Sequence, residues 1–331
     1  MELILVISLL VGFFLTLFFT PIWIRRAKDV GLVGKDIHKN EKVKVSEAGG
    51  VCVLFGFVLG ILSYIALKTF YFHDMNQFVE MFALLSVVMI VSFIGIIDDI
   101  LGWKIGLTKR TRILFLIFAS IPLVVINAGE SIIFGVKIGL LYPLVFIPIG
   151  IVGATATFNF LAGYNGLEAS QGIIILTSLA IIARIMENNW LAFIAFIMVS
   201  CLFAFLIFNK TPAKIFPGDV LTYSIGALIA TIAILGNIEK IAIFFFIPYI
   251  IETGLKLRGK LEKQSFAKLN SDGSLEVPYK KFYGLEHIAV YLLKRFKKSH
   301  KAYEAEVVYL INSFQVMIII LGLVIFRGTI F

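Results

Sequence analysis

The chain has 331 residues, of which 60% are hydrophobic, and its mean hydropathy of +0.97 is far above that of a water-soluble domain. Long apolar runs recur from one end of the sequence to the other, which predicts an all-α polytopic membrane protein without a separate soluble domain. The net charge of +9 accompanies no nucleic-acid-binding motif. The only two cysteines, Cys52 and Cys201, lie inside apolar runs, which argues against a disulfide framework or a zinc site.

Ten apolar segments are long enough to be predicted as membrane helices. The first is followed by Arg25, Arg26 and Lys28 and has no small-residue cleavage site, so we expect a retained anchor rather than a signal peptide. The whole chain, 1–331, is then one membrane domain, and its longest polar segment, at about 256–306, forms a cytoplasmic loop. The expected spans cover roughly residues 3–24, 49–69, 78–97, 110–127, 138–157, 171–187, 190–208, 218–236, 238–257 and 306–327.

Lysine and arginine are distributed unevenly between the loops. With the N-terminus outside, the loops after spans 1, 3, 5, 7 and 9, with the span ends beside them, hold 25 of the 30 basic residues. Because positively charged loops are retained in the cytoplasm, these loops are predicted to form the cytoplasmic face. The same charges favour contact with anionic membrane lipids. The outer loops are short, so we expect a reaction site on the cytoplasmic side.

The loop after the first span brings charged residues to the start of the second span. Lys39, Lys42, Lys44 and Glu47 precede Gly49 and Gly50. Lysine can hold a phosphate as a point charge. The loop is therefore a candidate anion-binding segment as well as a determinant of topology.

The third span ends in two adjacent carboxylates, Asp98 and Asp99. Ionised acids at a membrane boundary are costly unless they are paired, hydrated or bound to a cation, so the pair suggests a metal or a cationic partner. The alternative is an acidic turn that ends the helix and is held by following basic residues, among them Lys109, Arg110 and Arg112. The residues alone leave both interpretations open.

The segment 159–172 is polar and rich in glycine, although it lies between two apolar spans. Asn159 lies about one helical turn before Gly163, which leaves room for a ligand beside the amide, and the asparagine oxygen can ligate Mg²⁺. Asn165 and the following glycine predict a turn. A simple lead into the next helix, with Glu168 at the helix start, is the alternative, but it does not account for Asn159.

Asp219 begins the eighth span, after Phe216-Pro217-Gly218. On its own this pattern is typical of a helix cap stabilised by the helix dipole. Asp219 shares its predicted membrane face with Asp98, Asp99 and Asn159, however, and hard oxygen ligands from separate helices are what Mg²⁺ requires. The long loop at about 256–306 adds one histidine, His287, which we expect at the protein surface rather than at a metal.

In their order along the chain, these motifs resemble the polyprenyl-phosphate N-acetylhexosamine-1-phosphate transferases, of the glycosyl transferase family 4 type. These are ten-span enzymes that move a sugar phosphate from a UDP-sugar to a membrane lipid phosphate. The resemblance covers nearly the whole chain, and the segments around Asn165 and Asp219 are most similar to the dolichyl-phosphate branch of archaea and eukaryotes. The matching segments are residues 45–50, 97–99, 109–112, 159–172 and 216–219.

The resemblance implies that Asn159 and Asp219 coordinate Mg²⁺, with Mn²⁺ as the alternative ion, at the donor pyrophosphate. It also implies that Glu47 and Asn165 contribute to the nucleotide pocket, in which Gly163 leaves room for the ligand.

For the phosphates, the resemblance implies a contact from Arg112, a position at which relatives commonly carry lysine, with Lys109 and Arg110 beside it. Asp98 and Asp99 match the acidic pair of the family, for which a catalytic base role and a structural or electrostatic role are both open.

The implied reaction releases UMP and leaves a sugar joined through pyrophosphate to a polyprenyl or dolichyl lipid, the first membrane step of a pathway such as protein N-glycosylation. UDP-N-acetylglucosamine is the implied donor, and a homodimer is the implied assembly. Residues 263–265, Lys-Gln-Ser, depart from the basic, histidine-containing sugar motif of relatives, which leaves the sugar open. A cation- or proton-coupled transporter is the main alternative, but its acids would extend through the bilayer rather than gather at one face.

Overall fold

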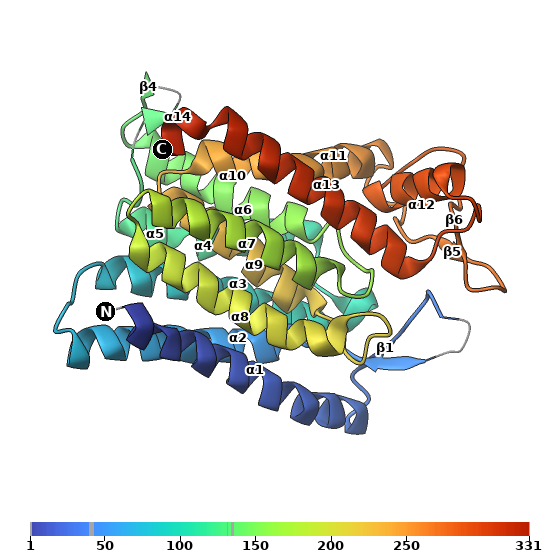
Figure 1. The fold of residues 1–331 in the computed structure, drawn as a ribbon, viewed down its shortest axis with the longest axis horizontal. Helices are drawn as coiled ribbons and strands as arrows, with labels where there is room; N and C mark the ends of the chain where they lie inside the picture. The colour runs from blue at the N-terminus through green and yellow to red at the C-terminus, as the bar shows by residue number, and fades with distance from the viewer. Residues whose placement is uncertain (1, 40–42, 131, 134–135, 331) are drawn as a thin grey trace.

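The computed structural model describes residues 2–39, 43–130, 132–133 and 136–330, and it is a bundle of helices that run along one common direction (Figure 1). Both chain termini lie at one end of the bundle. The opposite end carries the strands β1 (Val33–Lys35), β5 (Lys268–Leu269) and β6 (Leu275–Glu276) and the helix α12 (Leu285–Phe296). We call this opposite end the loop end.

Seven helices in the described part of the chain are long and apolar enough to cross a membrane, which is consistent with the expected polytopic membrane protein. They coincide with the expected spans 1, 2, 3, 6, 7, 8 and 10. They are α1 (Glu2–Asp29), α2 (Gly50–Ala66) continued by the π-helical turn η1 (Leu67–Tyr71), α3 (Phe78–Ile105), α7 (Leu167–Ile185), α8 (Asn189–Asn209), α9 (Gly218–Leu235) and α13 (Glu304–Ile325).

The other three expected spans are each divided into two consecutive helices. In each pair the second helix carries a proline, Pro122, Pro148 or Pro248, in its first turn. Proline has no N–H to donate to the preceding turn, so it separates the two helical pieces. Ten membrane crossings therefore remain a prediction. The pairs are α4 (Lys109–Ala119) with α5 (Ile121–Val125), η2 (Tyr142–Phe146) with α6 (Ile147–Phe158), and α10 (Glu239–Phe245) with α11 (Ile247–Arg258).

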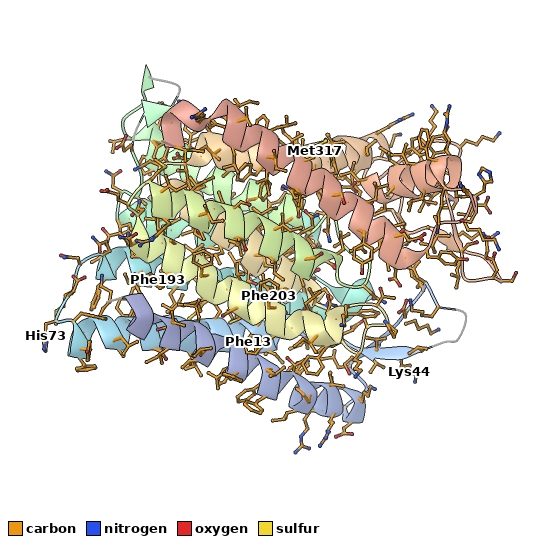
Figure 2. All side chains as sticks on the ribbon, in the orientation of Figure 1. Phe13, Lys44, His73, Phe193, Phe203 and Met317 are labelled. Carbon is orange, nitrogen blue, oxygen red and sulfur yellow. The ribbon has the colours of Figure 1, made fainter. Side chains whose placement is uncertain are left out.

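Apolar side chains cover the sides of the bundle, and charged residues gather at its two ends (Figure 2). Phe203 and Met317 are about half exposed on the sides, at 52% and 48%. Lys44 and His73 lie at opposite ends. A broad exposed apolar surface between polar ends is what lipid contact requires.

Helix α9 lies at the centre of the bundle and packs against α2, α3, α6 and α7. Its beginning is approached closely by two glycines of neighbouring helices. A Cβ atom at Gly50 would lie 2.5 Å from the backbone nitrogen of Leu221, and one at Gly95 would lie 2.6 Å from the Cα of Val220. Glycine is therefore required at both positions, and it lets α2 and α3 fix the place where α9 begins.

Short strand pairs close the loop end. Strand β1 pairs antiparallel with β2 (Lys44–Ser46), and β5 pairs with β6. The end of β2 and the start of α2 are also joined to the segment before α9: the N–H of Phe216 donates to the carbonyl of Ser46 at 2.7 Å, and the N–H of Gly50 donates to that of Pro217 at 2.8 Å. A third pair, β3 (Ile132–Ile133) with β4 (Val136–Lys137), lies near the termini, where α14 (Arg327–Ile330) ends the described chain.

Candidate active site

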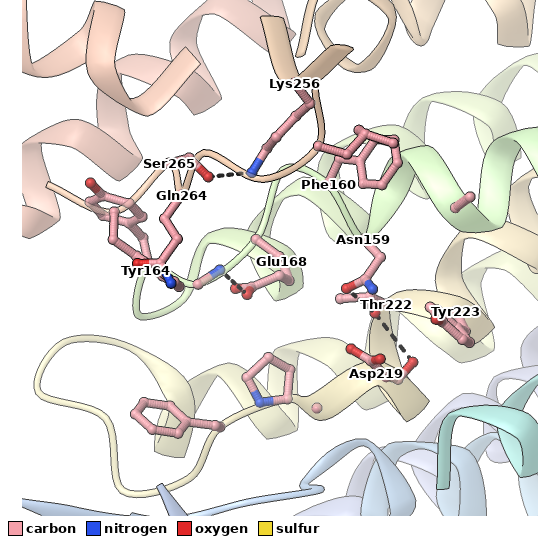
Figure 3. A pocket seen from close by; sticks show the side chains of 18 of the residues that line it. Asn159, Phe160, Tyr164, Glu168, Asp219, Thr222, Tyr223, Lys256, Gln264 and Ser265 are labelled. Carbon is pink, nitrogen blue, oxygen red and sulfur yellow. Dashed lines mark hydrogen bonds between the residues drawn. The ribbon is translucent and has the colours of Figure 1, made fainter. Parts of the chain in front are cut away.

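Several of the predicted motifs meet in one cavity of about 800 Å³ (Figure 3). Its walls come from the loop after α1, the start of α4, the end of α6 and the loop after it, the start of α9, and the loop after α11. These segments all belong to the loop end of the bundle. The polar lining includes Lys35, Asp36, Lys109, Arg112, Asn159, Asn165, Glu168, Asp219, Thr222, Lys256 and Ser265.

Asn159 and Asp219 lie next to each other on one wall of the cavity (Figure 3). Asn159 follows the last residue of α6, and Asp219 lies in the first turn of α9. The hydroxyl of Thr222 donates a hydrogen bond to Asn159 Oδ1 at 3.1 Å, which holds the amide oxygen beside α9. The Asp219 side chain is 26% exposed. An amide oxygen and a partly exposed carboxylate are the hard ligands that a divalent cation prefers, so these residues fit the expected metal.

Arg112 connects two of the acidic residues. Its Nη2 lies 2.5 Å from Asp98 Oδ2, and its Nη1 lies 3.8 Å from Asp219 Oδ2. Asp98 is buried, and its other oxygen accepts a hydrogen bond from the N–H of Leu107 at 2.8 Å. The guanidinium is thus anchored by a buried carboxylate while 32% of the side chain remains exposed. Lys109, in the first turn of α4, adds a second cation to the cavity lining.

Asp99 points to the start of α9 rather than into the cavity. Its Oδ1 accepts a hydrogen bond from the N–H of Asp219 at 2.7 Å, and its Oδ2 accepts one from the N–H of Val220 at 3.2 Å. The first N–H groups of a helix have no partner within the helix, so Asp99 acts as a cap supplied by another helix. Gly218 has a φ of 72°, and a side chain there would collide with the Asp99 carboxylate. Together these contacts fix the position of Asp219.

The loop between α6 and α7 is shaped by glycine. Gly163 has a φ of 104°, and a side chain at this position would collide with the ring of Phe266. Its N–H donates to Glu168 Oε1 at 2.6 Å. Glu168 lies buried in the first turn of α7, as expected for a helix-start residue, and it also lines the cavity. Glycine at this position therefore lets Phe266 pack against the loop.

Of the ten site residues predicted from the sequence, six line the cavity and four do not, within the described part of the chain. Asp98 and Asp99 lie directly behind the lining and hold Arg112 and α9. Glu47 is half-buried beside Gly34, and burial raises the pKa of its carboxyl. Arg110 is exposed on the first turn of α4. The six lining residues are Lys109, Arg112, Asn159, Gly163, Asn165 and Asp219.

The sequence motifs did not identify several residues of the lining. In the sequence, Lys35 and Lys256 are explained as loop charges that determine topology. Nothing else in the sequence indicates that they line the cavity. Asp36 offered one usable signal, a carboxylate within a strongly basic loop. Thr222 and Tyr223 follow the predicted Asp219, but only the helical geometry of α9 shows that their side chains reach the same cavity.

A second layer of charged residues lies behind the cavity wall. It is reached through Lys256, which lines the cavity and is hydrogen-bonded to Ser265 (Figure 3). Lys256 Nζ lies 2.5 Å from Ser265 Oγ and 3.6 Å from Oε1 of the buried Glu252. Glu286 and His287, from α12, are fully buried. The expectation that His287 lies at the surface was therefore wrong, because α12 packs this face against α11 and α13.

Glu286 allows a prediction about stability. Burial raises the pKa of its carboxyl, and the charge of Glu252 raises it further. A carboxyl whose pKa is raised by folding lowers stability as the pH rises above its unfolded pKa, because the folded state resists losing the proton. We expect Glu286→Gln to raise the thermal unfolding temperature by about 2 °C or more near pH 7.5. The difference from the wild type should vanish near pH 4, and a less stable variant at pH 7.5 would contradict the prediction.

Comparison with known proteins identifies the family of the chain. The profile of glycosyl transferase family 4 matches residues 81–237. An inferred UDP-N-acetylglucosamine–dolichyl-phosphate N-acetylglucosaminephosphotransferase of Saccharolobus solfataricus is 37% identical over 88% of this chain and 89% of the relative. Its counterpart from Sulfolobus acidocaldarius is 34% identical over 96% and 95%. The phospho-N-acetylmuramoyl-pentapeptide-transferase of Streptococcus equi is 30% identical over 74% and 76%. This chain belongs to glycosyl transferase family 4.

Proposed function

We propose that this protein transfers N-acetylglucosamine 1-phosphate from UDP-N-acetylglucosamine to a dolichyl or other polyprenyl phosphate and releases UMP. The observation that carries the proposal is the single cavity in which Asn159, Asp219 and Arg112 combine oxygen ligands with a fixed cation. The relatives that match nearly the whole chain are named for this reaction. The matched relatives also include a transferase that is named for a different sugar group. The identity of the donor sugar is therefore part of the proposal.

The main obstacle to the reaction is repulsion between two anions. A lipid phosphate has its second pKa at about 6, so at neutral pH it already carries most of its charge and needs little help from a base. Arg112 and Lys109 would hold the donor pyrophosphate and the acceptor phosphate together. An oxygen of the acceptor then attacks the β-phosphorus of the donor, and the bond from this phosphorus to the oxygen bridging the α-phosphorus breaks, so that UMP leaves.

Mg²⁺, or Mn²⁺ in its place, would be held by Asn159 and Asp219 and would supply charge neutralisation at the pyrophosphate. Asp98 and Asp99 then act through other groups: Asp98 orients the Arg112 guanidinium, and Asp99 holds the start of α9. This placement supports the electrostatic and structural role for the acidic pair rather than the role of a base.

The cavity also suits a ligand with an apolar chain. Beside its polar groups it is lined by Ile113 and Leu116 from α4 and by Ala156 and Phe160 from the end of α6 and the loop after it. Ile113 is 48% exposed. A polyprenyl chain could therefore lie along α4 while its phosphate reaches Arg112.

We propose ten crossings, an outer N-terminus and a cytoplasmic active site. The five basic residues outside the predicted cytoplasmic set belong to η1, β4, the end of α7, the start of α10 and α14. Both termini lie at the end of the bundle opposite the cavity, which an even number of crossings requires. The three proline-divided pairs would supply the crossings beyond the seven long helices. Membrane lipids would surround the apolar sides, and a homodimer is the proposed assembly.

The activity can be tested with purified protein, polyprenyl phosphate and a panel of radiolabelled UDP-sugars. We expect a labelled lipid from UDP-N-acetylglucosamine, loss of the signal with EDTA, and recovery when Mg²⁺ is added in excess. Omission of the lipid is the control for label that binds without transfer. If no donor of the panel gives a labelled lipid, the proposed reaction is wrong, and if EDTA has no effect, the metal is wrong.

A further inference from the structure

The side-chain amide of Asn165 is held by two carboxylates from distant parts of the chain. Its Nδ2 donates hydrogen bonds to Asp36 Oδ2 at 2.9 Å and to Glu304 Oε2 at 3.4 Å. Its backbone N–H donates to Glu304 Oε1 at 3.0 Å. All three residues are buried, with 6% or less of each exposed. The contact joins the loop after β1, the loop after α6 and the first residue of α13.

This pairing determines which way the amide faces. A carboxylate can only accept hydrogen bonds, so both Nδ2 hydrogens of Asn165 must point toward Asp36 and Glu304. Within the described residues, Oδ1 receives no hydrogen bond. Asn165 lines the cavity, and Asp36 and Glu304 occupy the hydrogens of its Nδ2 group. The atom that the amide can offer to a ligand is therefore the acceptor Oδ1.

Glu304 is tied to the same loop by two further groups. Lys39 Nζ lies 2.5 Å from Glu304 Oε2, and His38 Nδ1 lies 3.5 Å from Glu304 Oε1. His38 packs against the ring of Tyr164, with 4.4 Å between ring centroids. Glu304 is not part of the cavity lining in the described chain, so it acts on a ligand only through its neighbours.

We propose that Glu304 is a positioning residue for the donor nucleotide: with Asp36 it locks the Asn165 amide so that Oδ1 faces the base. With Oδ1 aligned with position 3 of the pyrimidine ring, the acceptor selects a base that carries an N–H at that position. Uracil has an N–H at N3, where cytosine has an unprotonated nitrogen. The lock therefore favours uridine over cytidine nucleotides. The inference rests on the proposed function, which places the donor nucleotide in this cavity.

The test compares the binding of UMP and CMP to the full-length protein by calorimetry, so that it does not depend on transfer. We expect the wild type to bind UMP at least about tenfold more tightly than CMP, as expected when a buried acceptor would be left unpaired. In Glu304→Gln, one Nδ2 partner becomes an amide that can itself face either way, and this ratio should fall at least fivefold. The matched control is Glu306→Gln, since Glu306 belongs to the same helical turn but pairs with Lys297 away from the cavity. It should keep the wild-type ratio.

Two further variants keep the proposal testable if Glu304→Gln does not fold. Asp36→Asn removes the other acceptor and should lower the UMP to CMP ratio in the same way. Lys39→Ala removes only the ion pair with Glu304 and should keep the ratio. In transfer assays we expect Glu304→Gln to raise the KM for the UDP-sugar at least fivefold. Its kcat and its KM for the lipid should change less than twofold.

The outcomes separate this inference from the function on which it rests. Wild-type discrimination in both Glu304→Gln and Asp36→Asn would overturn the lock and leave the proposed function standing. Equal weakening of UMP and CMP would also overturn it, because that result indicates a general loss of structure. If the wild type binds neither UMP nor CMP, the proposed function fails and the lock fails with it.

Discussion

Replacement of Asp219 by alanine should lower the transfer rate by at least about 10³-fold and leave the protein folded in detergent. The carboxylate lies beside the Asn159 amide in the cavity, and its Oδ2 lies 3.8 Å from Arg112 Nη1. Without it, a divalent cation at this place would lose a charged oxygen ligand and keep the neutral amide of Asn159. The fold should survive, because Asp99 caps α9 through the backbone N–H of residue 219, which alanine retains.

The measurement is the initial rate at saturating donor and lipid, with the unfolding temperature of each variant recorded in the same detergent. Asp74→Ala is the matched control. Asp74 is also a carboxylate beside a cation, 2.9 Å from Lys68, but it lies beyond η1, far from the cavity lining. It should retain wild-type activity. A folded Asp219→Ala variant with near-normal activity would rule out Asp219 as a metal ligand.

The gathering of Asn159, Arg112 and Asp219 at one site could be predicted from the sequence because membrane topology restricts where polar residues can lie. Each of these residues stands at the end of an apolar segment, and the alternation of basic and neutral loops places those ends on the same side. The hydrophobic pattern therefore predicts their approximate depth. It does not predict which helices are neighbours, and the central position of α9 depends on close contacts such as that of Gly95 with Val220.

The direction of individual side chains could not be predicted in the same way. Asp98 and Asp99 are adjacent in sequence, yet neighbouring residues of a helix point about 100° apart. One therefore reaches Arg112 and the other reaches the start of α9. The same rule separates Arg110, which is exposed, from Arg112, which enters the cavity. The division of three expected spans into two helices each was not predicted. Mean hydropathy is averaged over a whole span, so a single proline such as Pro248 hardly changes it although it ends a helix.

The loss of activity on replacing Arg112 should depend more on the charge of the new side chain than on its shape. Arg112→Gln is expected to lower kcat/KM by about 10²- to 10³-fold, whereas Arg112→Lys should stay within about tenfold of the wild type. Glutamine leaves the buried Asp98 without its cation and leaves its negative charge close to the phosphates. Lysine retains a positive charge between Asp98 and Asp219, although it lacks the fork that can contact both carboxylates.

A double variant separates the two consequences of losing Arg112. Asp98→Asn combined with Arg112→Gln removes both charges of the ion pair, so it should recover much of the stability that Arg112→Gln loses, since an unpaired buried carboxylate costs about 3–5 kcal/mol. It should not recover activity, because no cation replaces the guanidinium at the phosphates. Unfolding temperature and kcat/KM of the four proteins in the cycle give the answer. Recovery of both quantities in the double variant would mean that Arg112 only neutralises Asp98, and the proposed phosphate contact would then be wrong.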